Sequence, residues 1–469
     1  MNRRPHACAV LLLAVVVGAL STAFPVTAAP AAAAAAECSA TAQTELQKRL
    51  LAEANAERRS AGAAPVALHT DINAVALAWS KKQAAANDMS HNPSCSSQIP
   101  SGWRAAGENV AAGHRMTAVM DGWMGSPGHR KNILNSSYTS MGVGVACSSS
   151  GRPYYTQVFA AYPSSVFGDA PRLWGSDRYQ TAAAVSASRF AAGVGVVYLA
   201  NGTAFPDALA GAAAAGTRNA PVLLTEADAL PAATAKELAR LQPKSIVVLG
   251  GTAAVADAVV AAASRYTTGP VKRIAGADRY ETSALVANTF APGISVAYVA
   301  AGSTFPDALA GAAAAGTRNA PVLLATRAGI PDPTAKALTT LKPKSIVVLG
   351  GTSAISDAVL GSLRSYTGGS VTRQAGADRY ATAAKVADTF PTSTTTVYVA
   401  NGNTFPDALA GAAVAGTSSV PVLLTSGSSI PTATAVALSR LDPKKVVILG
   451  GSASISESVR AQLLRYATG

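Results

Sequence analysis

The sequence predicts an α/β protein in which three tandem modules, each a doubly wound parallel sheet, follow a smaller N-terminal domain. The string Phe-Pro-Asp-Ala-Leu-Ala-Gly begins at Phe205, Phe305 and Phe405, a spacing of 100 residues. Short apolar segments alternate with helix-like segments, which is typical of a parallel sheet covered on both faces. The 469 residues also exceed the roughly 250 that one core usually supports. We expect three modules within residues 170–469, and tandem copies usually build a symmetric binding surface.

The second copy shows the order of elements expected in each module. Its apolar segments predict strands at 271–274, 296–300, 321–324 and 345–349. The segments between and after them predict helices at 280–290, 306–315, 333–341 and 355–366. Each module is therefore expected to hold four βα units with right-handed crossovers.

Three recurring motifs follow the ends of these predicted strands. Asp-Arg-Tyr stands at 177–179, 278–280 and 378–380, Phe-Pro-Asp follows the second strand of each copy, and Gly-Gly follows the fourth. In open α/β sheets the carboxyl ends of strands are where ligands bind, beside helix N-termini that favour anions. We expect the three loops of each module to meet on one rim.

The charged residues of these motifs have both a structural and a functional interpretation. Asp278 is a good N-cap, and Glu281 completes a capping box. Arg279 lies at a helix start, where a cation opposes the helix dipole, so it needs an anionic partner. That partner is either an aspartate across the rim, such as Asp307, or a ligand. The candidate ligand-contact residues are Arg172, Asp177, Arg178, Tyr179, Asp207, Arg218, Arg273, Asp278, Arg279, Tyr280, Asp307, Arg318, Arg373, Asp378, Arg379, Tyr380 and Asp407.

The third copy is not identical to the others, because Ser418 stands where Arg218 and Arg318 recur. The formal net charge is +13. Residues 164–469 hold 25 basic and 17 acidic side chains, a net +8. This excess favours an anionic partner. Nucleic acid is not expected as that partner, because no basic run occurs and aromatic residues make up 6%.

The first 29 residues have the features of a secretory signal peptide. Arg3 and Arg4 precede the apolar stretch 10–20, and Val26-Thr27-Ala28 forms a small-residue cleavage site. Residues 30–37 are expected to be an alanine-rich linker. No later segment is apolar over about 18 residues, so no transmembrane segment is expected. The chain also ends without a hydrophobic sorting signal, and we expect any attachment to the cell surface to be noncovalent.

Three cysteines follow the signal sequence, all before the repeats. We expect one disulfide, between Cys95 and Cys147, with Cys38 outside it. Connectivity does not follow from sequence alone.

Residues 38–162 form the smaller domain, with helices expected at 46–61 and 71–86 and a strand at 141–147. His91, Glu108 and His129 are candidates for a metal or acid–base cluster, because imidazole and carboxylate are common zinc ligands and proton carriers. Alternatively, Glu108 caps a turn and His129 is hydrogen-bonded within a packed loop. Spacing does not decide between these interpretations.

The repeats resemble the type-two cell-wall-binding repeat of Gram-positive bacteria. The resemblance rests on the order Gly-Xaa-Asp-Arg-Tyr, Phe-Pro-Asp-Ala-Leu, Pro-Val-Leu-Leu and Val-Val-Leu-Gly-Gly, which occurs three times with small variations. It implies modules at 170–269, 270–369 and 370–469 after a linker at 163–169, assembled as a triangular pseudo-trimer. It also implies binding to an anionic secondary cell-wall polymer.

Residues 38–162 resemble the CAP superfamily of secreted proteins, through Gly-Glu-Asn at 107–109 and Pro-Gly-His-Arg at 127–130. The resemblance implies an α-β-α sandwich whose cleft holds a divalent metal, often zinc, on two histidines and two acids. His91 and Glu108 match this set, whereas Ser126 and Tyr154 stand at the other two positions. With His129, at most a three-residue cluster is expected. The resemblance also implies a small-molecule or lipid ligand for the CAP domain.

Three functions compete at this point. We expect a secreted, monomeric surface protein that binds wall polymer and displays the CAP domain, with binding favoured over catalysis. The alternative is a wall- or protein-directed hydrolase in which His91, Glu108 and His129 activate water, with or without zinc. A nucleotide-binding array is a third interpretation, but neither a Gly-Xaa-Gly-Xaa-Xaa-Gly nor a Walker string occurs.

Overall fold

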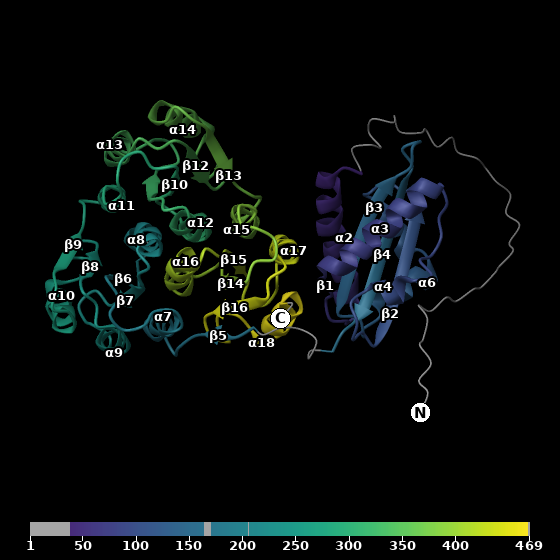
Figure 1. Ribbon diagram of the computed structural model, residues 1–469, viewed down its shortest axis with the longest axis horizontal. Coiled ribbons are helices and arrows are strands. Elements are labelled where there is room, and N and C mark those ends of the chain that lie inside the picture. The colour runs from purple at the N-terminus through teal and green to yellow at the C-terminus, as the bar shows by residue number, and fades with distance from the viewer. Residues whose placement is uncertain (1–37, 164–169, 205, 468–469) are drawn as a thin grey trace, which may run out of the picture. The chain divides into compact units, whose positions relative to one another are not determined.

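The computed structural model describes residues 38–163, 170–204 and 206–467. The expected signal peptide (1–29), the linker at 30–37 and most of the linker at 163–169 lie outside the described residues. The chain divides into two compact units, residues 1–168 with 464–468 and residues 169–463 with 469. Figure 1 labels their elements, and each unit is described by itself.

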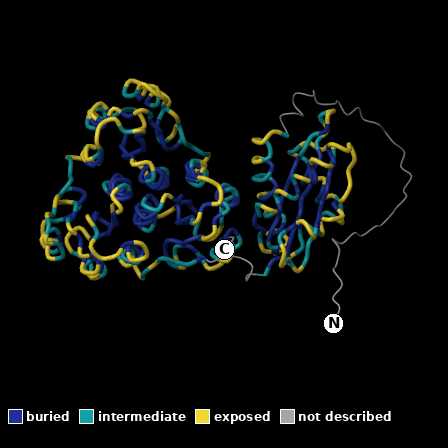
Figure 2. Tube along the Cα trace, in the orientation of Figure 1, coloured by how far each residue is buried: buried dark blue, intermediate teal, exposed yellow. Residues whose placement is uncertain are grey.

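The first unit is built on a four-stranded sheet of order β1-β3-β4-β2. The strands are β1 (Ala67–Leu68), β2 (Ala105–Ala112), β3 (Ser140–Cys147) and β4 (Pro153–Ala161). β4 pairs antiparallel with β2 and β3, and β1 pairs parallel with β3. The helices are α2 (Ala40–Ser60), α3 (Thr70–Ala86), α4 (Cys95–Gln98), α5 (Val119–Met124) and α6 (Pro127–Leu134). The central strands are buried, as Figure 2 shows.

Helix α3 lies directly on β3 because two glycines leave room for its backbone. A Cβ atom at Gly142 would lie 2.3 Å from the carbonyl carbon of Ile72, and one at Gly144 would lie 2.4 Å from the Cα of Leu77. No side chain fits into these gaps, so the close helix–strand contact depends on glycine.

A fully buried arginine ties helix α2 to the loop after α6. The Arg58 guanidinium donates to the carbonyls of Ala64, Ile133, Asn135 and Tyr138 at 2.8 to 3.1 Å. Burial lowers the pKa of Arg58 to about 10. The carbonyl oxygens replace the water that this charge loses on folding.

The disulfide joins Cys38 to Cys147, with the two Cα atoms 5.8 Å apart. The predicted Cys95–Cys147 bond is therefore wrong. Cys95 is buried at the start of α4, in a core that includes Ile99 and Val158, and takes no part in this bond. Cys147 ends β3, and the pairing closes the chain between that strand end and the start of α2. Sequence spacing carries no information about this proximity.

The second unit contains three parallel four-stranded sheets. The first holds β7 (Val222–Thr225), β6 (Val197–Asn201), β8 (Ile246–Leu249) and β9 (Val271–Ile274), in that order. The second holds β11 (Val322–Ala325), β10 (Ala297–Ala301), β12 (Ile346–Leu349) and β13 (Val371–Gln374). The third holds β15 (Val422–Thr425), β14 (Thr396–Asn401), β16 (Lys445–Leu449) and β5 (Arg172–Leu173).

The fourth strand of every sheet comes from the next copy of the repeat. β9 pairs with β8, β13 pairs with β12, and β5 at the start of the first copy pairs with β16 of the third. The sheets are thus offset by one strand from the period of the sequence. Because β5 completes the last sheet, the three copies close into a ring within one chain.

Four helices accompany each sheet. They are α7 (Arg178–Ala187), α8 (Pro206–Thr217), α9 (Ala232–Leu241) and α10 (Asp257–Ala263) in the first copy. The second copy has α11 (Arg279–Ala287), α12 (Pro306–Thr317), α13 (Asp332–Leu341) and α14 (Asp357–Ser362), and the third has α15 (Arg379–Ala387), α16 (Pro406–Ser418), α17 (Thr432–Leu441) and α18 (Glu457–Leu463). Short 3-10 turns follow at η2 (Ser264–Tyr266) and η3 (Leu363–Tyr366), and a third, η4 (Leu464–Tyr466), belongs to the first unit.

Helices α8, α12 and α16 meet at the centre of the ring, and the sheets lie outside them (Figure 1). Near the C-terminal ends of these helices a Cβ atom at Gly316 would lie 2.9 Å from the Cα of Gly416 and 3.3 Å from the Cα of Gly216. The three backbones therefore approach closely, and the predicted pseudo-trimer is confirmed.

The central helices run side by side in one direction. At their N-terminal ends the rings of Phe305 and Phe405 are 5.7 Å apart, and at the other end the three glycines meet. Each helix leads from the carboxyl end of one strand to the amino end of the next, so all three sheets point the same way. We call the side with the Asp-Arg-Tyr and Gly-Gly loops the carboxyl-end face, and the side with the loops that precede the strands the amino-end face.

Candidate functional site

The aspartate of each Asp-Arg-Tyr motif caps the helix that follows it. Asp278 Oδ1 accepts from the backbone N–H groups of Tyr280 and Glu281, both at 2.9 Å. Asp177 and Asp378 each accept one such bond at 2.7 Å. These side chains satisfy N–H groups that the first helical turn leaves without partners.

The arginine of the motif binds a backbone carbonyl in its own copy. Arg178, Arg279 and Arg379 donate through Nη1 to the carbonyls of the glycines that follow the second strand, at 2.6, 2.7 and 2.7 Å. The tyrosine packs on the same glycine, since a Cβ atom at Gly302 would lie 2.6 Å from Tyr280 Cε1. The motif therefore fastens a helix start to the end of a neighbouring strand.

The aspartate of each Phe-Pro-Asp string faces the motif of the next copy. Asp207 is hydrogen-bonded to Thr282 and lies near Arg279, and Asp307 makes the same contacts with Thr382 and Arg379. Burial raises the pKa of both carboxyls, while their hydroxyl and guanidinium neighbours lower it.

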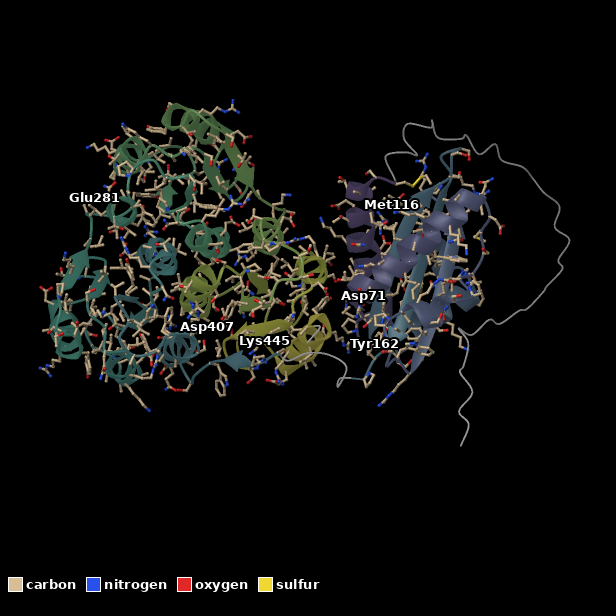
Figure 3. The ribbon with its side chains drawn as sticks, in the orientation of Figure 1. Asp71, Met116, Tyr162, Glu281, Asp407 and Lys445 are labelled. Carbon is tan, nitrogen blue, oxygen red and sulfur yellow. A yellow bond between two sulfur atoms is a disulfide. The ribbon has the colours of Figure 1, made fainter. Side chains whose placement is uncertain are left out.

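Asp407, labelled in Figure 3, completes the set between the third copy and the first. Burial raises the pKa of its carboxyl, against hydrogen bonds from Ser454 and Thr181 and the charge of Arg178. The predicted rim residues thus meet at three junctions between copies. Sequence reasoning missed the threonines Thr181, Thr282 and Thr382, whose recurrence four residues after the motif aspartate was the available signal.

The Gly-Gly turns leave space for these aspartates. Gly250 has a φ of 95°, in the left-handed region that favours glycine. A Cβ atom there would lie 2.5 Å from Asp207 Oδ2. The glycine is therefore needed for both its backbone conformation and its small size.

A second arginine contacts the same Gly-Gly turns. It lies on the edge strand that pairs with the sheet of the preceding copy. Arg273 donates to the Gly250 carbonyl and to Asp257, both at 2.8 Å. Arg373 makes the equivalent contacts with Gly350 and Asp357, at 2.8 and 2.9 Å.

Arg172 does the same at the closure of the ring. It donates to the carbonyls of Gly450 and Ile455 and to Glu457, at 3.2, 2.7 and 3.0 Å. The three acids at the starts of the last helices, Asp257, Asp357 and Glu457, were not foreseen as partners.

Arg218 and Arg318 lie away from the Asp-Arg-Tyr and Gly-Gly loops. Both follow the C-terminal ends of central helices, on the amino-end face, and both are exposed. Arg218 donates to the hydroxyl of Tyr198 and to the carbonyl of Thr289. The structure therefore separates these two predicted site residues from the other fifteen.

In the first unit, His91 and Glu108 are in contact. His91 Nδ1 lies 2.8 Å from Glu108 Oε1, which also accepts from the backbone N–H of Asn92 at 2.9 Å. The Glu108 side chain is 3% exposed and that of His91 is 50% exposed. Glu108 Oε2 is buried without a hydrogen-bond partner among the described residues.

His129 lies in α6 near this pair. Its carbonyl accepts from Asn109 at 3.2 Å. Burial lowers the pKa of the His129 imidazole, and the charge of His91 lowers it further. The structure thus brings the three predicted cluster residues into one region of the unit.

These residues do not form a metal centre in the observed arrangement. Across the described residues no group of three or more His, Cys, Asp or Glu side chains is placed to hold a metal ion. His91 directs Nδ1 toward the carboxylate, and at the two departing positions Ser126 precedes α6 while the Tyr154 hydroxyl donates to Asn87 at 2.9 Å. The donor set therefore does not fit zinc, and we derive no step through a metal.

The fold defines a modular protein in which a closed ring of three α/β repeats accompanies one α/β sandwich domain. The chain belongs to the cell wall binding domain 2 family, whose model matches residues 172–260, 273–360 and 373–460. Residues 51–159 match the cysteine-rich secretory protein family, which is the CAP domain. The two resemblances expected from the motifs are confirmed.

Known proteins support this assignment. N-acetylmuramoyl-L-alanine amidase LytC of Bacillus subtilis is 32% identical over 292 residues, which are 62% of this chain and 57% of the amidase. The structure of Cwp6 from Clostridium difficile matches 64% of this chain and 48% of Cwp6, with a TM-score of 0.61 and 26% identity. Cwp8 from the same organism matches 63% of this chain and 51% of its own, with a TM-score of 0.58 and 26% identity. The chain thus spans about half the length of these relatives.

No helix in the described ranges is long and apolar enough to cross a membrane.

Proposed function

We propose that this chain is a secreted protein that its three repeats hold noncovalently on an anionic cell-wall polymer, where it displays the CAP domain. The observation that carries the proposal is the closed ring of three repeats from a family described as cell wall binding. The net positive charge of the repeats supports an anionic partner.

A ring of three similar repeats suits a polymer made of repeating units. Three linked sites gain avidity, because binding at one raises the effective concentration at the others. The junction contacts fix the copies relative to one another, so little freedom is lost on binding. Since β5 of the same chain completes the last sheet, the array needs no second chain, and we propose a monomer.

Polymer contact by the motif residues stays a prediction. The aspartates and arginines at the junctions already bind one another or the backbone, so a polymer at the carboxyl-end face would meet groups that have partners.

The CAP domain supports a second candidate activity. The buried Glu108 carboxylate holds the exposed His91 imidazole at 2.8 Å, and such pairs orient a general base. A wall- or protein-directed hydrolase is therefore the alternative to binding of a small molecule or lipid. A Glu108→Gln variant that keeps its melting temperature but loses hydrolysis of isolated walls would support it; wild-type protein without any hydrolysis would leave binding as the function.

Cell fractionation tests the main proposal. The full-length precursor is expressed in a Gram-positive host, and cytosol, medium and washed walls are assayed. We expect the protein on the walls and its release by concentrated salt without wall digestion, because the attachment is electrostatic. Protein that stays in the cytosol, or leaves the walls only after their digestion, would contradict the proposal.

A further inference from the structure

The amino-end face of the repeat ring carries exposed cations from all three copies. Lys244, Lys344 and Lys444 each precede the third strand of their sheets, and all three are exposed. Their backbone N–H groups donate to Val194, Ile294 and Thr394, at 2.9, 2.9 and 3.2 Å. The loops are therefore held in place while the ammonium groups stay in solvent.

Each copy contributes at least two exposed cations to this face. The first copy supplies Arg218 with Lys244, and the second supplies Arg318 with Lys344. The third copy has Ser418 in place of the arginine, but it has Lys445 beside Lys444 where the other copies have serine. The charge lost at one position of the third copy is thus restored at another.

The arginines lie closer to the centre of the ring than the lysines do. Arg218 and Arg318 stand two residues beyond Gly216 and Gly316, which meet at the axis. The helix dipole stabilises a cation at a helix C-terminus, so the charges of these arginines are stabilised even without a bound anion. The six residues Arg218, Lys244, Arg318, Lys344, Lys444 and Lys445 are called the basic face below.

The amino-end face carries more cations than carboxylates. None of the six forms an ion pair among the residues that the structure describes. The described amino-end loops of the ring contribute two carboxylates, Asp388 and Asp442. Asp388 is bound to Lys385 and Arg440. The potential of this face is therefore positive.

The carboxyl-end face differs in the state of its cations. Arg279 and Arg273 already bind carbonyls, and Arg273 also binds Asp257, which is 80% exposed. A polyanion would have to replace these bonds and would meet the junction carboxylates. On the basic face a polyanion would compete with the hydrogen bonds of Arg218 to Tyr198 and Thr289, and at the lysines it would displace water and counterions.

We infer that the basic face is the surface on which the anionic wall polymer docks, and that the motif arginines build the ring. This inference rests on the proposed function. Flexible lysines act as point charges that suit a phosphate- or carboxylate-bearing chain without demanding one geometry.

The test uses the mature full chain and isolated Gram-positive walls, either native or stripped of anionic polymer by acid extraction. The variant K244Q/K344Q/K444Q removes three charges from the basic face. The control K236Q/K336Q/R327Q removes three exposed charges from other parts of the ring. Melting temperatures of all three proteins are measured first, and we expect them to agree because every substituted side chain is exposed.

Co-sedimentation with native walls is then measured over a sodium chloride series. We expect wild type and control to bind alike, and the basic-face variant to bind about tenfold or more weakly with a shallower dependence on salt. Equal binding by the two variants would overturn the inference and leave the proposed function standing. Equal binding of wild type to native and stripped walls would instead refute the proposed function.

Discussion

Arg172, at the start of the first repeat, pairs with Ile448 near the end of the third in a parallel ladder. The N–H of Ile448 donates to the carbonyl of Pro171 at 2.8 Å, and that of Gly450 donates to Leu173 at 3.0 Å. This pairing turns three consecutive repeats into a ring.

The Arg172→Ala variant tests the closure. The Arg172 side chain is 9% exposed and binds two backbone carbonyls, whereas the side chain of its acidic partner Glu457 is 61% exposed. Loss of the carbonyl bonds should lower the unfolding free energy by about 1.5–3 kcal/mol. Glu457→Gln should cost less than about 1 kcal/mol, because an exposed ion pair contributes little. Equal losses in chemical denaturation would show that the carbonyl contacts do not hold the ring.

The glycines at the axis give a matched pair of variants. Gly316→Ala places a Cβ atom 2.9 Å from the Cα of Gly416, whereas one at Gly361 in α14 meets nothing within 4 Å. We expect the first to lower the unfolding free energy by about 1–3 kcal/mol through overpacking. Gly361→Ala should leave stability unchanged or raise it, because alanine favours helix. The central packing would be wrong if the two alanines had the same effect on thermal denaturation.

The buried junction aspartates predict a pH dependence. Burial raises the pKa values of Asp207, Asp307 and Asp407 above the ordinary 3.8, so the folded ring binds protons more tightly than the unfolded chain does. Their contribution to stability should therefore rise as pH falls through the raised pKa values and level off below 3.8.

The D207N/D307N/D407N variant removes this titration. On acidification from about pH 7 to about pH 4.5, the melting temperature of wild type should rise relative to that of the triple variant. The exposed Asp228→Asn serves as a control for the loss of a surface carboxylate. A triple variant that differs from wild type by the same amount at both pH values would contradict the burial of these carboxyls.

Thiol alkylation under denaturing conditions tests the disulfide assignment. The oxidised mature chain should take up one alkyl group, at Cys95, because Cys38 and Cys147 are bonded. Cys147→Ser should lower the stability of the CAP domain by about 2–5 kcal/mol, since the bond closes a long loop. Peptide mapping that found the label on Cys38 would contradict the assignment.

Local rules predicted most of the fold, because they act over short distances. The predicted strand at 345–349 and helix at 333–341 match β12 and α13 within one residue at each end. The capping by Asp278 was also among the predicted alternatives and is observed. The repeat period of the sequence does not specify which neighbouring copy receives an edge strand. The sequence places the strand 271–274 in the sheet of the second copy, whereas β9 pairs with β8 of the first copy.

The site was predicted less completely for a related reason. Sequence placed Arg279 and Asp307 among the candidates on one rim, but not the carbonyl of Gly302 that binds the arginine. Every residue carries a backbone carbonyl, so a sequence motif does not indicate which carbonyl accepts a hydrogen bond. The same holds for Cys38 and Cys147, whose proximity depends on where β3 ends relative to α2.

Retention of the mature protein on native and on polymer-stripped walls decides whether the repeats bind an anionic polymer. We expect wild type to sediment with native walls, to be released as sodium chloride is raised, and to stay in solution with stripped walls. Retention on stripped walls equal to that on native walls would show that the repeats do not bind an anionic polymer.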